Sequence, residues 1–384
     1  MTGTQEAPVG RLVGLILTAT LMIIAGCAST AKPAGGTSVA DTQPGGSAVR
    51  MPAVQQGPAA PPTSVQIGRR PWRFAAYEGS LISTAHYRIH TTLEYDHILQ
   101  RLPVFMEHAI ERYTTALADL PEPGRPLETY LFHDRRQWMA KTRQILPHEA
   151  ATFDALGRGG FTTRGIAVLY YIDHNGRYRD TFAIAAHEGW HQYTQSTFRQ
   201  PLPIWLEEGI ATYMEGHQWG EEAPRFIPSR NWERRGALRR AIRADALIPL
   251  DDLLTRAPQF FLEENKDRLL TYYGQVWALT RFLADGADGR YREALAELLT
   301  DAARGRLGHR LSVSLSTRPA AAPTINSNRP RRSRRVALND LGTWLVKTYF
   351  DEDVAAFEEA YFAYARALAE GGPVRGPRRG RRAR

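Results

Sequence analysis

Residues 181–215 read TFAIAAHEGWHQYTQSTFRQPLPIWLEEGIATYME, and this stretch carries the most informative pattern in the chain. It contains His187-Glu188-Gly-Trp-His191, a match to H-E-x-x-H inside a predicted helix over 181–198. At 3.6 residues per turn, positions i and i+4 lie nearly above one another, so both histidines can reach one metal ion. Glu188 is rotated about a quarter turn, so its carboxylate can act on a metal-bound water as a general base without being a ligand.

A second predicted helix, over 203–215, supplies a third ligand. Glu207 and Glu208 stand sixteen and seventeen residues after His191. Adjacent helical residues point about 100° apart, so one of the two glutamates faces the metal and the spacing alone leaves open which. His217 is a more remote alternative. Two histidines with one glutamate form a catalytic zinc set, because the fourth position stays open for water.

The second segment, Trp205-Leu206-x-Glu208-Gly-x-Ala, resembles the gluzincin metallopeptidases, and the aminopeptidase N group in particular. That resemblance implies a zincin-like fold in which His187, His191 and Glu208 hold Zn²⁺ and Glu188 is the base. Tyr213 and Glu215 stand where that group has an aromatic residue and an acid. The whole combination looks like an uncharacterised bacterial family with a peptidase-MA-like fold.

The same resemblance suggests a donor for the oxyanion. In the aminopeptidase N group a tyrosine some sixty residues past the glutamate ligand has this role. Tyr272 and Tyr273 stand 64 and 65 residues after Glu208, and the Tyr-x-x-x-Trp-Ala-Leu pattern favours Tyr273. Thermolysin-like enzymes orient a zinc histidine with an Asp four residues after the glutamate. This chain has Thr212 there, whose hydroxyl can accept a weaker hydrogen bond from an imidazole.

We expect a zinc metallopeptidase that hydrolyses peptide bonds through a zinc-activated water. Gluzincin exopeptidases hold the substrate amine with an acidic strand, whereas residues 159–172 contain no acid, which favours an endopeptidase. One alternative is a non-catalytic envelope lipoprotein that keeps the fold to bind peptide or peptidoglycan. Another is zinc-dependent hydrolysis of a non-peptide amide, such as a cell-wall cross-link.

The N-terminal sequence predicts a membrane-anchored lipoprotein of the cell envelope. Leu12 to Ala25 is an uncharged apolar run, too short to span a bilayer and typical of a signal-peptide core. The following Ile-Ala-Gly-Cys27 resembles a bacterial lipobox, so residues 1–26 are expected to be removed and Cys27 acylated. Because Cys27 is the only cysteine, no intramolecular disulfide can form.

The remaining pattern predicts an α+β fold, with a small mixed β-sheet portion followed by a mainly α-helical portion. The predicted domain covers 71–370, after a Pro/Gly/Ala-rich tether over 27–70. Strands are expected at 86–91 and 127–132, with a hairpin over 159–172. Helices are expected at 96–117, 137–145, 181–198 (with Asp180 as N-cap), 203–215, 232–244, 269–284, 291–303, 338–349 and 354–369.

The formal net charge of +9 is concentrated in two segments. Residues 329–335 and 375–384 carry five and six arginines and no acid, so the rest of the chain is slightly negative. These runs fall in a predicted disordered insertion, about 315–335, and in a basic tail, 371–384. Solvated tails or loose attraction to anionic lipid explain them, and no specific nucleic-acid binding is expected. The expected partners are a peptide or protein substrate and the membrane.

Overall fold

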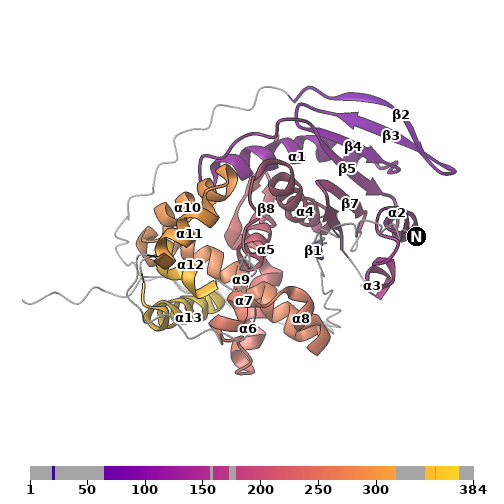
Figure 1. The fold of residues 1–384 in the computed structure, drawn as a ribbon. Helices are drawn as coiled ribbons and strands as arrows, with labels where there is room; N and C mark the ends of the chain where they lie inside the picture. The colour runs from indigo at the N-terminus through magenta and orange to yellow at the C-terminus, as the bar shows by residue number, and fades with distance from the viewer. Residues whose placement is uncertain are drawn as a thin grey trace, which may run out of the picture.

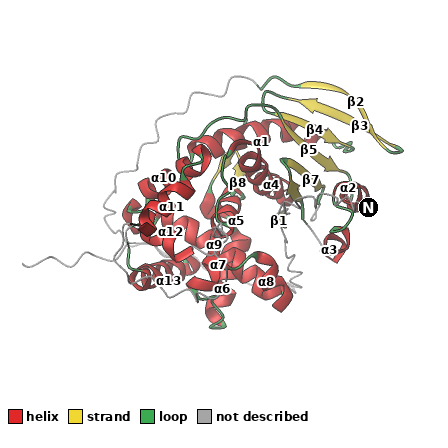
Figure 2. Ribbon diagram, in the orientation of Figure 1, coloured by secondary structure: helices red, strands yellow, loops and turns green. Residues whose placement is uncertain are grey.

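The computed structural model describes residues 20–21, 65–155, 159–172, 179–316, 342–350 and 352–371. Within them the chain builds a mixed sheet first and a helical portion afterwards, which confirms the predicted α+β class and its order (Figures 1 and 2). The sheet lies at the upper right of Figure 1, and the later helices pack below and to the left of it.

The main sheet has the strand order β1-β6-β7-β5-β4-β3-β2. Strands β4, β5 and β7 are parallel, and the others pair antiparallel with their neighbours. β1 is the two-residue segment Thr20–Leu21, which pairs with β6 at the edge of the sheet. The other strands are β2 (Gly68–Phe74), β3 (Tyr77–Ser83), β4 (Tyr87–Thr91), β5 (Leu127–Phe132), β6 (Phe161–Thr163) and β7 (Ile166–Tyr170).

Helices cover both faces of this sheet. On one face lie α1 (Asp96–Thr115) and α4 (Arg179–Thr197), and on the other lies α2 (Arg135–Ile145), followed by α3 (Ala150–Ala155). The alternation of side chains along β5 sets this division, because successive residues point to opposite faces. Thr129 donates a hydrogen bond to Gln192 of α4, and its neighbour Tyr130 receives the Lys141 ammonium of α2 over its ring.

The second half of the described chain is a group of helices around α9. This helix is buried along most of its length and contacts α5, α6, α8 and α13. The helices are α5 (Ile204–Met214), α6 (Trp232–Arg243), α7 (Leu250–Thr255), α8 (Pro258–Glu264), α9 (Lys266–Asp285), α10 (Arg292–Arg304), α11 (Leu307–Ser316), α12 (Gly342–Tyr349) and α13 (Val354–Glu370). A small hairpin, β8 (His217–Trp219) with β9 (Pro224–Phe226), and two 3₁₀ turns (Pro228–Arg230 and Ala287–Gly289) complete the set.

The predicted start of α4 was wrong by two residues. The helix begins at Arg179, so Asp180 lies inside the first turn and is not the N-cap. A negative charge in the first turn still interacts favourably with the positive end of the helix dipole. The signal peptide apart from Thr20–Leu21, most of the tether, most of the Arg-rich insertion and the basic tail lie outside the described residues.

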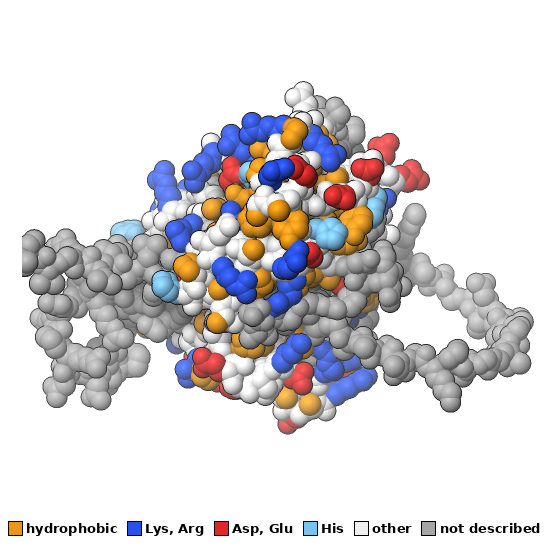
Figure 3. Space-filling view, turned by 90° about the vertical axis from the view of Figure 1, so that its right-hand side faces the viewer, with side chains coloured by type: hydrophobic (Ala, Val, Ile, Leu, Met, Phe, Trp, Pro, Cys, Tyr) orange, Lys and Arg blue, Asp and Glu red, His pale blue; other side chains and the backbone are white. Residues whose placement is uncertain are grey.

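The surface of the described residues exposes few large apolar side chains: Ile67, Tyr95, Trp232 and Phe260. On the face shown in Figure 3, basic and acidic side chains are interspersed with hydrophobic ones. Among the described helices, none combines the length and the apolar character that a bilayer span requires.

Candidate metal centre

The H-E-x-x-H segment lies in the middle of α4, which is buried on almost every side. Apart from Ala183, residues 181–194 are buried, and α4 packs against α1, against strands β6 and β7 and against α5. A helix enclosed in this way is expected to be apolar all round. The buried polar residues His187, Glu188 and His191 depart from that expectation and therefore need partners inside the protein.

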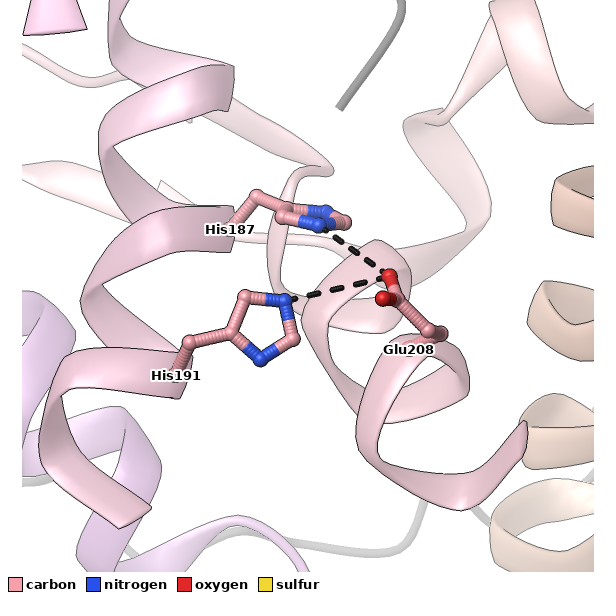
Figure 4. A group of neighbouring side chains, drawn as sticks. All are labelled: His187, His191 and Glu208. Atoms are coloured by element: carbon pink, nitrogen blue, oxygen red, sulfur yellow. Dashed lines mark ion pairs between the residues drawn. The ribbon is translucent and has the colours of Figure 1, made fainter. Parts of the chain in front are cut away.

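Two neighbouring helices bring three ligand atoms to one point. Nε2 of His187 and Nε2 of His191 lie 3.5 and 3.8 Å from Oε2 of Glu208, the glutamate supplied by α5 (Figure 4). All three side chains are buried, and their ligand atoms lie within 4.8 Å of one another. This cluster can hold a metal ion, and it settles the choice between the adjacent glutamates in favour of Glu208 as the inward-facing one.

Both imidazoles are oriented by carboxylates on their far side. Nδ1 of His187 donates to Oε1 of Glu215 at 2.9 Å, and Nδ1 of His191 donates to Oε1 of Glu207 at 2.9 Å. Each Nδ1 therefore carries the proton, which leaves the Nε2 lone pairs directed at Glu208. Glu207 and Glu215, which stand on either side of Glu208 in the sequence, therefore orient the two histidines.

The three converging atoms suit a cation because no described residue forms a hydrogen bond with them. Nε2 of His187, Nε2 of His191 and Oε2 of Glu208 are buried and have no hydrogen-bond partner among the described residues. Burial lowers the pKa of His187 to about 4, so the imidazole is neutral at neutral pH, as a metal ligand must be. Burial, followed by the charges of Glu188 and Glu207, raises the pKa of Glu208 well above its ordinary value. A divalent cation offsets this excess of negative charge.

Glu188 stands beside the cluster, held by strand β6 of the sheet. Thr162 of β6 places its Oγ1 2.8 Å from Oε2 of Glu188 and 3.0 Å from the Glu188 carbonyl oxygen. Oε1 of Glu188 is buried and has no partner among the described residues. Burial raises the pKa of Glu188 to about 8, although the hydrogen bond from Thr162 opposes this rise. The unpartnered Oε1 is therefore the oxygen of Glu188 that can exchange a proton.

Tyr272 and Tyr273 both lie on α9 and are fully buried. The ring of Tyr273 is 6.3 Å from the His187 ring, whereas the ring of Tyr272 stacks on Phe261 at 5.0 Å. Burial and the Glu208 charge raise the pKa of both hydroxyls well above the ordinary value, so both remain donors at neutral pH. The ring contacts place Tyr273 nearer the cluster.

The Thr212 prediction was wrong. Its hydroxyl donates to the Gly209 carbonyl oxygen at 2.8 Å, and the imidazole of His187 is supported by Glu215 instead. Likewise His217 lies apart from the cluster, since its Nδ1 donates to the Glu215 carbonyl oxygen at 2.9 Å.

Sequence reasoning missed three supporting residues, Thr162, Asn231 and Arg234. Asn231 Nδ2 donates to Oε2 of Glu215 at 2.6 Å, and Arg234 forms a buried ion pair with the same carboxylate. None of the three carried a local signal, because each reaches the site from an element remote in sequence. No known protein family, curated protein or solved structure shows a significant match to the chain.

Proposed function

We propose that this protein is a zinc-dependent endopeptidase with a zincin-like fold, anchored by a lipid at the bacterial cell envelope. One observation carries the proposal. Among the described residues, two imidazole nitrogens and one carboxylate oxygen converge without other hydrogen-bond partners, and the unpartnered Oε1 of Glu188 is buried beside them. A purely structural role does not require an additional buried, half-satisfied carboxyl group, which is costly to maintain.

His187, His191 and Glu208 would hold the metal, and Glu188 would handle the proton. A bound Zn²⁺ supplies a Lewis acid and lowers the pKa of water. Oε1 of Glu188 would accept the proton of the attacking water and then deliver it to the leaving amine. Thr162 fixes the other oxygen, Oε2, so the carboxyl group keeps one orientation through both transfers. Burial raises the pKa of Glu188 above that of an exposed carboxyl group, which makes its carboxylate a stronger base.

Charge that develops on the substrate carbonyl oxygen needs a hydrogen-bond donor. Tyr273 is our candidate, because its ring neighbours His187 and its hydroxyl stays protonated. The charges of Glu208 and Glu188 both contribute to the raised pKa of Tyr273, so its hydroxyl lies near the proposed metal ligand and the proposed base. These neighbours support Tyr273 over Tyr272.

The sheet edge next to Glu188 supports a peptide as substrate. β6 contacts Glu188 through Thr162, and its outer side pairs antiparallel with Thr20–Leu21. That short segment belongs to the predicted signal peptide, so its removal would leave the edge free. An extended peptide can add to such an edge through its backbone, whatever its side chains. The scissile amide would then lie close to the base.

The carboxylates around the cluster support an endopeptidase. An aminopeptidase needs a free acid to bind the substrate amine. Glu215 is engaged by His187, Asn231 and Arg234, and Glu207 is engaged by His191 and Thr194, whose hydroxyl donates to it at 2.6 Å. Both acids are therefore committed to holding the histidines.

The test compares metal content and peptide cleavage in the chain from residue 28 onward. The wild-type protein is expected to bind about one zinc per chain. It should also cleave internal bonds in a mixed peptide library, and mass spectrometry identifies the products. Glu188→Gln should keep the zinc and lose about 10²- to 10⁴-fold in turnover, the usual contribution of general acid–base catalysis. Glu222→Gln, which alters an exposed acid, is the matched control and should behave as wild type.

Two results would contradict the proposal. Turnover by Glu188→Gln at the wild-type rate would remove Glu188 as the base. Zinc binding by the wild type without cleavage of any peptide would favour the binding lipoprotein or a non-peptide amide as substrate.

A further inference from the structure

We propose that Arg234 is a positioning residue that holds the metal ligand His187, through Glu215, in register with Tyr273. This inference rests on the proposed function for the catalytic role of Tyr273, while its effect on the metal site stands on the contacts alone. Arg234 is one of five arginines in α6, whose sequence WERRGALRRAIR gives the impression of a solvated helix face. The structure separates Arg234 from the others, because its side chain is completely buried.

The guanidinium of Arg234 donates two parallel hydrogen bonds to the Glu215 carboxylate. Nη2 donates to Oε1 at 2.8 Å, and Nε donates to Oε2 at 3.1 Å. The same Oε1 accepts the Nδ1 proton of His187, and Asn231 donates to Oε2. Such a forked contact fixes the plane of the carboxylate as well as its position. With that plane fixed, the imidazole of His187 has one favoured rotation.

The same guanidinium faces Tyr273. Its Cζ lies 4.9 Å from the centre of the tyrosine ring, within the range of a cation–π contact. The backbones are fixed as well: a Cβ on Gly274 would lie 3.0 Å from the Arg234 carbonyl oxygen, so α6 and α9 touch directly beside Tyr273. One planar group therefore contacts the support of a metal ligand on one side and the oxyanion candidate on the other.

The two contacts of this side chain, with Glu215 and with the Tyr273 ring, require arginine at position 234. Lysine carries the same charge, but it has neither the forked donors nor a flat face to lie against a ring. A simple stabilising ion pair between α5 and α6 would depend mainly on charge and packing. A positioning role predicts that Arg234→Lys disturbs the metal site even where the fold survives.

The experiment measures zinc dissociation, the visible spectrum of the Co²⁺-substituted protein, kcat and KM, and the urea midpoint for four proteins. They are wild type, Arg234→Lys, the double variant Arg234→Met/Glu215→Leu, and Arg239→Met. Arg239 is the matched control on the same helix, since its guanidinium donates to the Ala369 carbonyl oxygen of α13 and lies on a different face of α6.

Arg234→Lys should weaken zinc binding about 10- to 100-fold, as loss of support for a ligand typically does. The Co²⁺ bands should shift, and kcat should fall with little change in KM. The double variant replaces the buried ion pair by apolar groups but leaves the donors of His187 and Asn231 without Glu215, so it should recover only part of the stability and none of the metal affinity. Arg239→Met should lower the urea midpoint and leave zinc affinity and the Co²⁺ bands unchanged.

Wild-type zinc affinity and Co²⁺ bands in Arg234→Lys would overturn the inference, as would an equal loss of zinc affinity in Arg239→Met. A wild-type protein that binds no zinc would also overturn it. A wild type that binds zinc but cleaves no peptide would remove the proposed function alone, because the zinc and Co²⁺ measurements on Arg234 would still decide the positioning role.

Discussion

Gly209, the residue after the proposed ligand Glu208, should tolerate no side chain. A Cβ built there would lie 2.3 Å from Oγ1 of Thr280 and 2.9 Å from the Val276 carbonyl oxygen, both on α9. The threonine can rotate, but the helical carbonyl cannot, so α5 must move by several tenths of an ångström. Overpacking of this kind costs about 1–3 kcal/mol, and alanine regains at most about 1 kcal/mol through helix propensity. We therefore expect Gly209→Ala to lower the free energy of unfolding by about 1–2 kcal/mol.

Gly236 of α6 provides the matched control. A Cβ there would meet only the Arg240 guanidinium, at an ordinary 3.5 Å. Gly236→Ala should raise the free energy of unfolding by about 0.5–1 kcal/mol, the helix-propensity gain without a clash. Urea denaturation of both variants, with equal zinc loading, measures the difference. Gly209→Ala should also weaken zinc binding, because the displaced helix carries Glu208.

A second variant separates the clash from other causes. Oγ1 of Thr280 has no partner among the described residues, so Thr280→Ala removes no hydrogen bond. The pair Gly209→Ala/Thr280→Ala should recover part of the lost stability, and the contact with the Val276 carbonyl should retain the rest. Two results would refute the predicted clash at Gly209. One is a Gly209→Ala protein as stable to urea as Gly236→Ala, and the other is a double variant no more stable than Gly209→Ala.

Three further outcomes are expected. Tyr273→Phe should lower kcat about 10²- to 10³-fold with KM and zinc content nearly unchanged, and a loss confined to Tyr272→Phe would mean that the wrong tyrosine was chosen. Burial lowers the pKa of His217 from 6.5 to about 4, so the fold favours its neutral form and stability falls as pH drops from 6.5 toward 4. Between pH 7 and pH 5 the free energy of unfolding of the wild type should therefore fall by about 2 kcal/mol more than that of His217→Asn, whose amide can replace the Nδ1 donor. Denaturation at each pH measures this difference, and an equal pH dependence of the two proteins would contradict the expectation. Mass spectrometry of the N-terminal peptide should find Cys27 acylated, and a Cys27→Ser variant still wholly in the membrane fraction would show that another segment holds the protein there.

The features that were predictable from the sequence are those encoded within a few turns of helix. The i, i+4 spacing of His187 and His191 needed no tertiary information, and neither did the helix that carries Glu208. The adjacent glutamates could not be distinguished from spacing, because the choice depends on how α5 faces α4. The roles of Glu207 and Glu215 follow from that same rotation.

The first strands were missed for a different reason. β2 is exposed over most of its length, so it lacks the alternation of buried and exposed residues that predicts a strand. Its turn to β3 is Ala75-Ala76, with Ala75 at φ 51°, a conformation usually marked by glycine or asparagine. Arg234 and Thr162 were missed because no pattern along the chain distinguishes them from surface residues of the same type. Their roles depend on contacts between segments far apart in sequence.

Helix α5 together with its C-cap residue Glu215 supplies three of the carboxylates at this centre, and that has a consequence for how the protein can evolve. Each glutamate has a different contact: Glu207 accepts from His191, Glu215 accepts from His187, and Glu208 belongs to the cluster itself. These contacts depend on fixed angles between the three residues around one helix axis. Insertion or deletion of one residue between Glu208 and Glu215 would turn one side of the helix by about 100° relative to the other. Homologues that keep the centre should thus vary in length between α4 and α5 but not within α5. A gap between Glu207 and Glu215 would mark a branch that has lost the cluster.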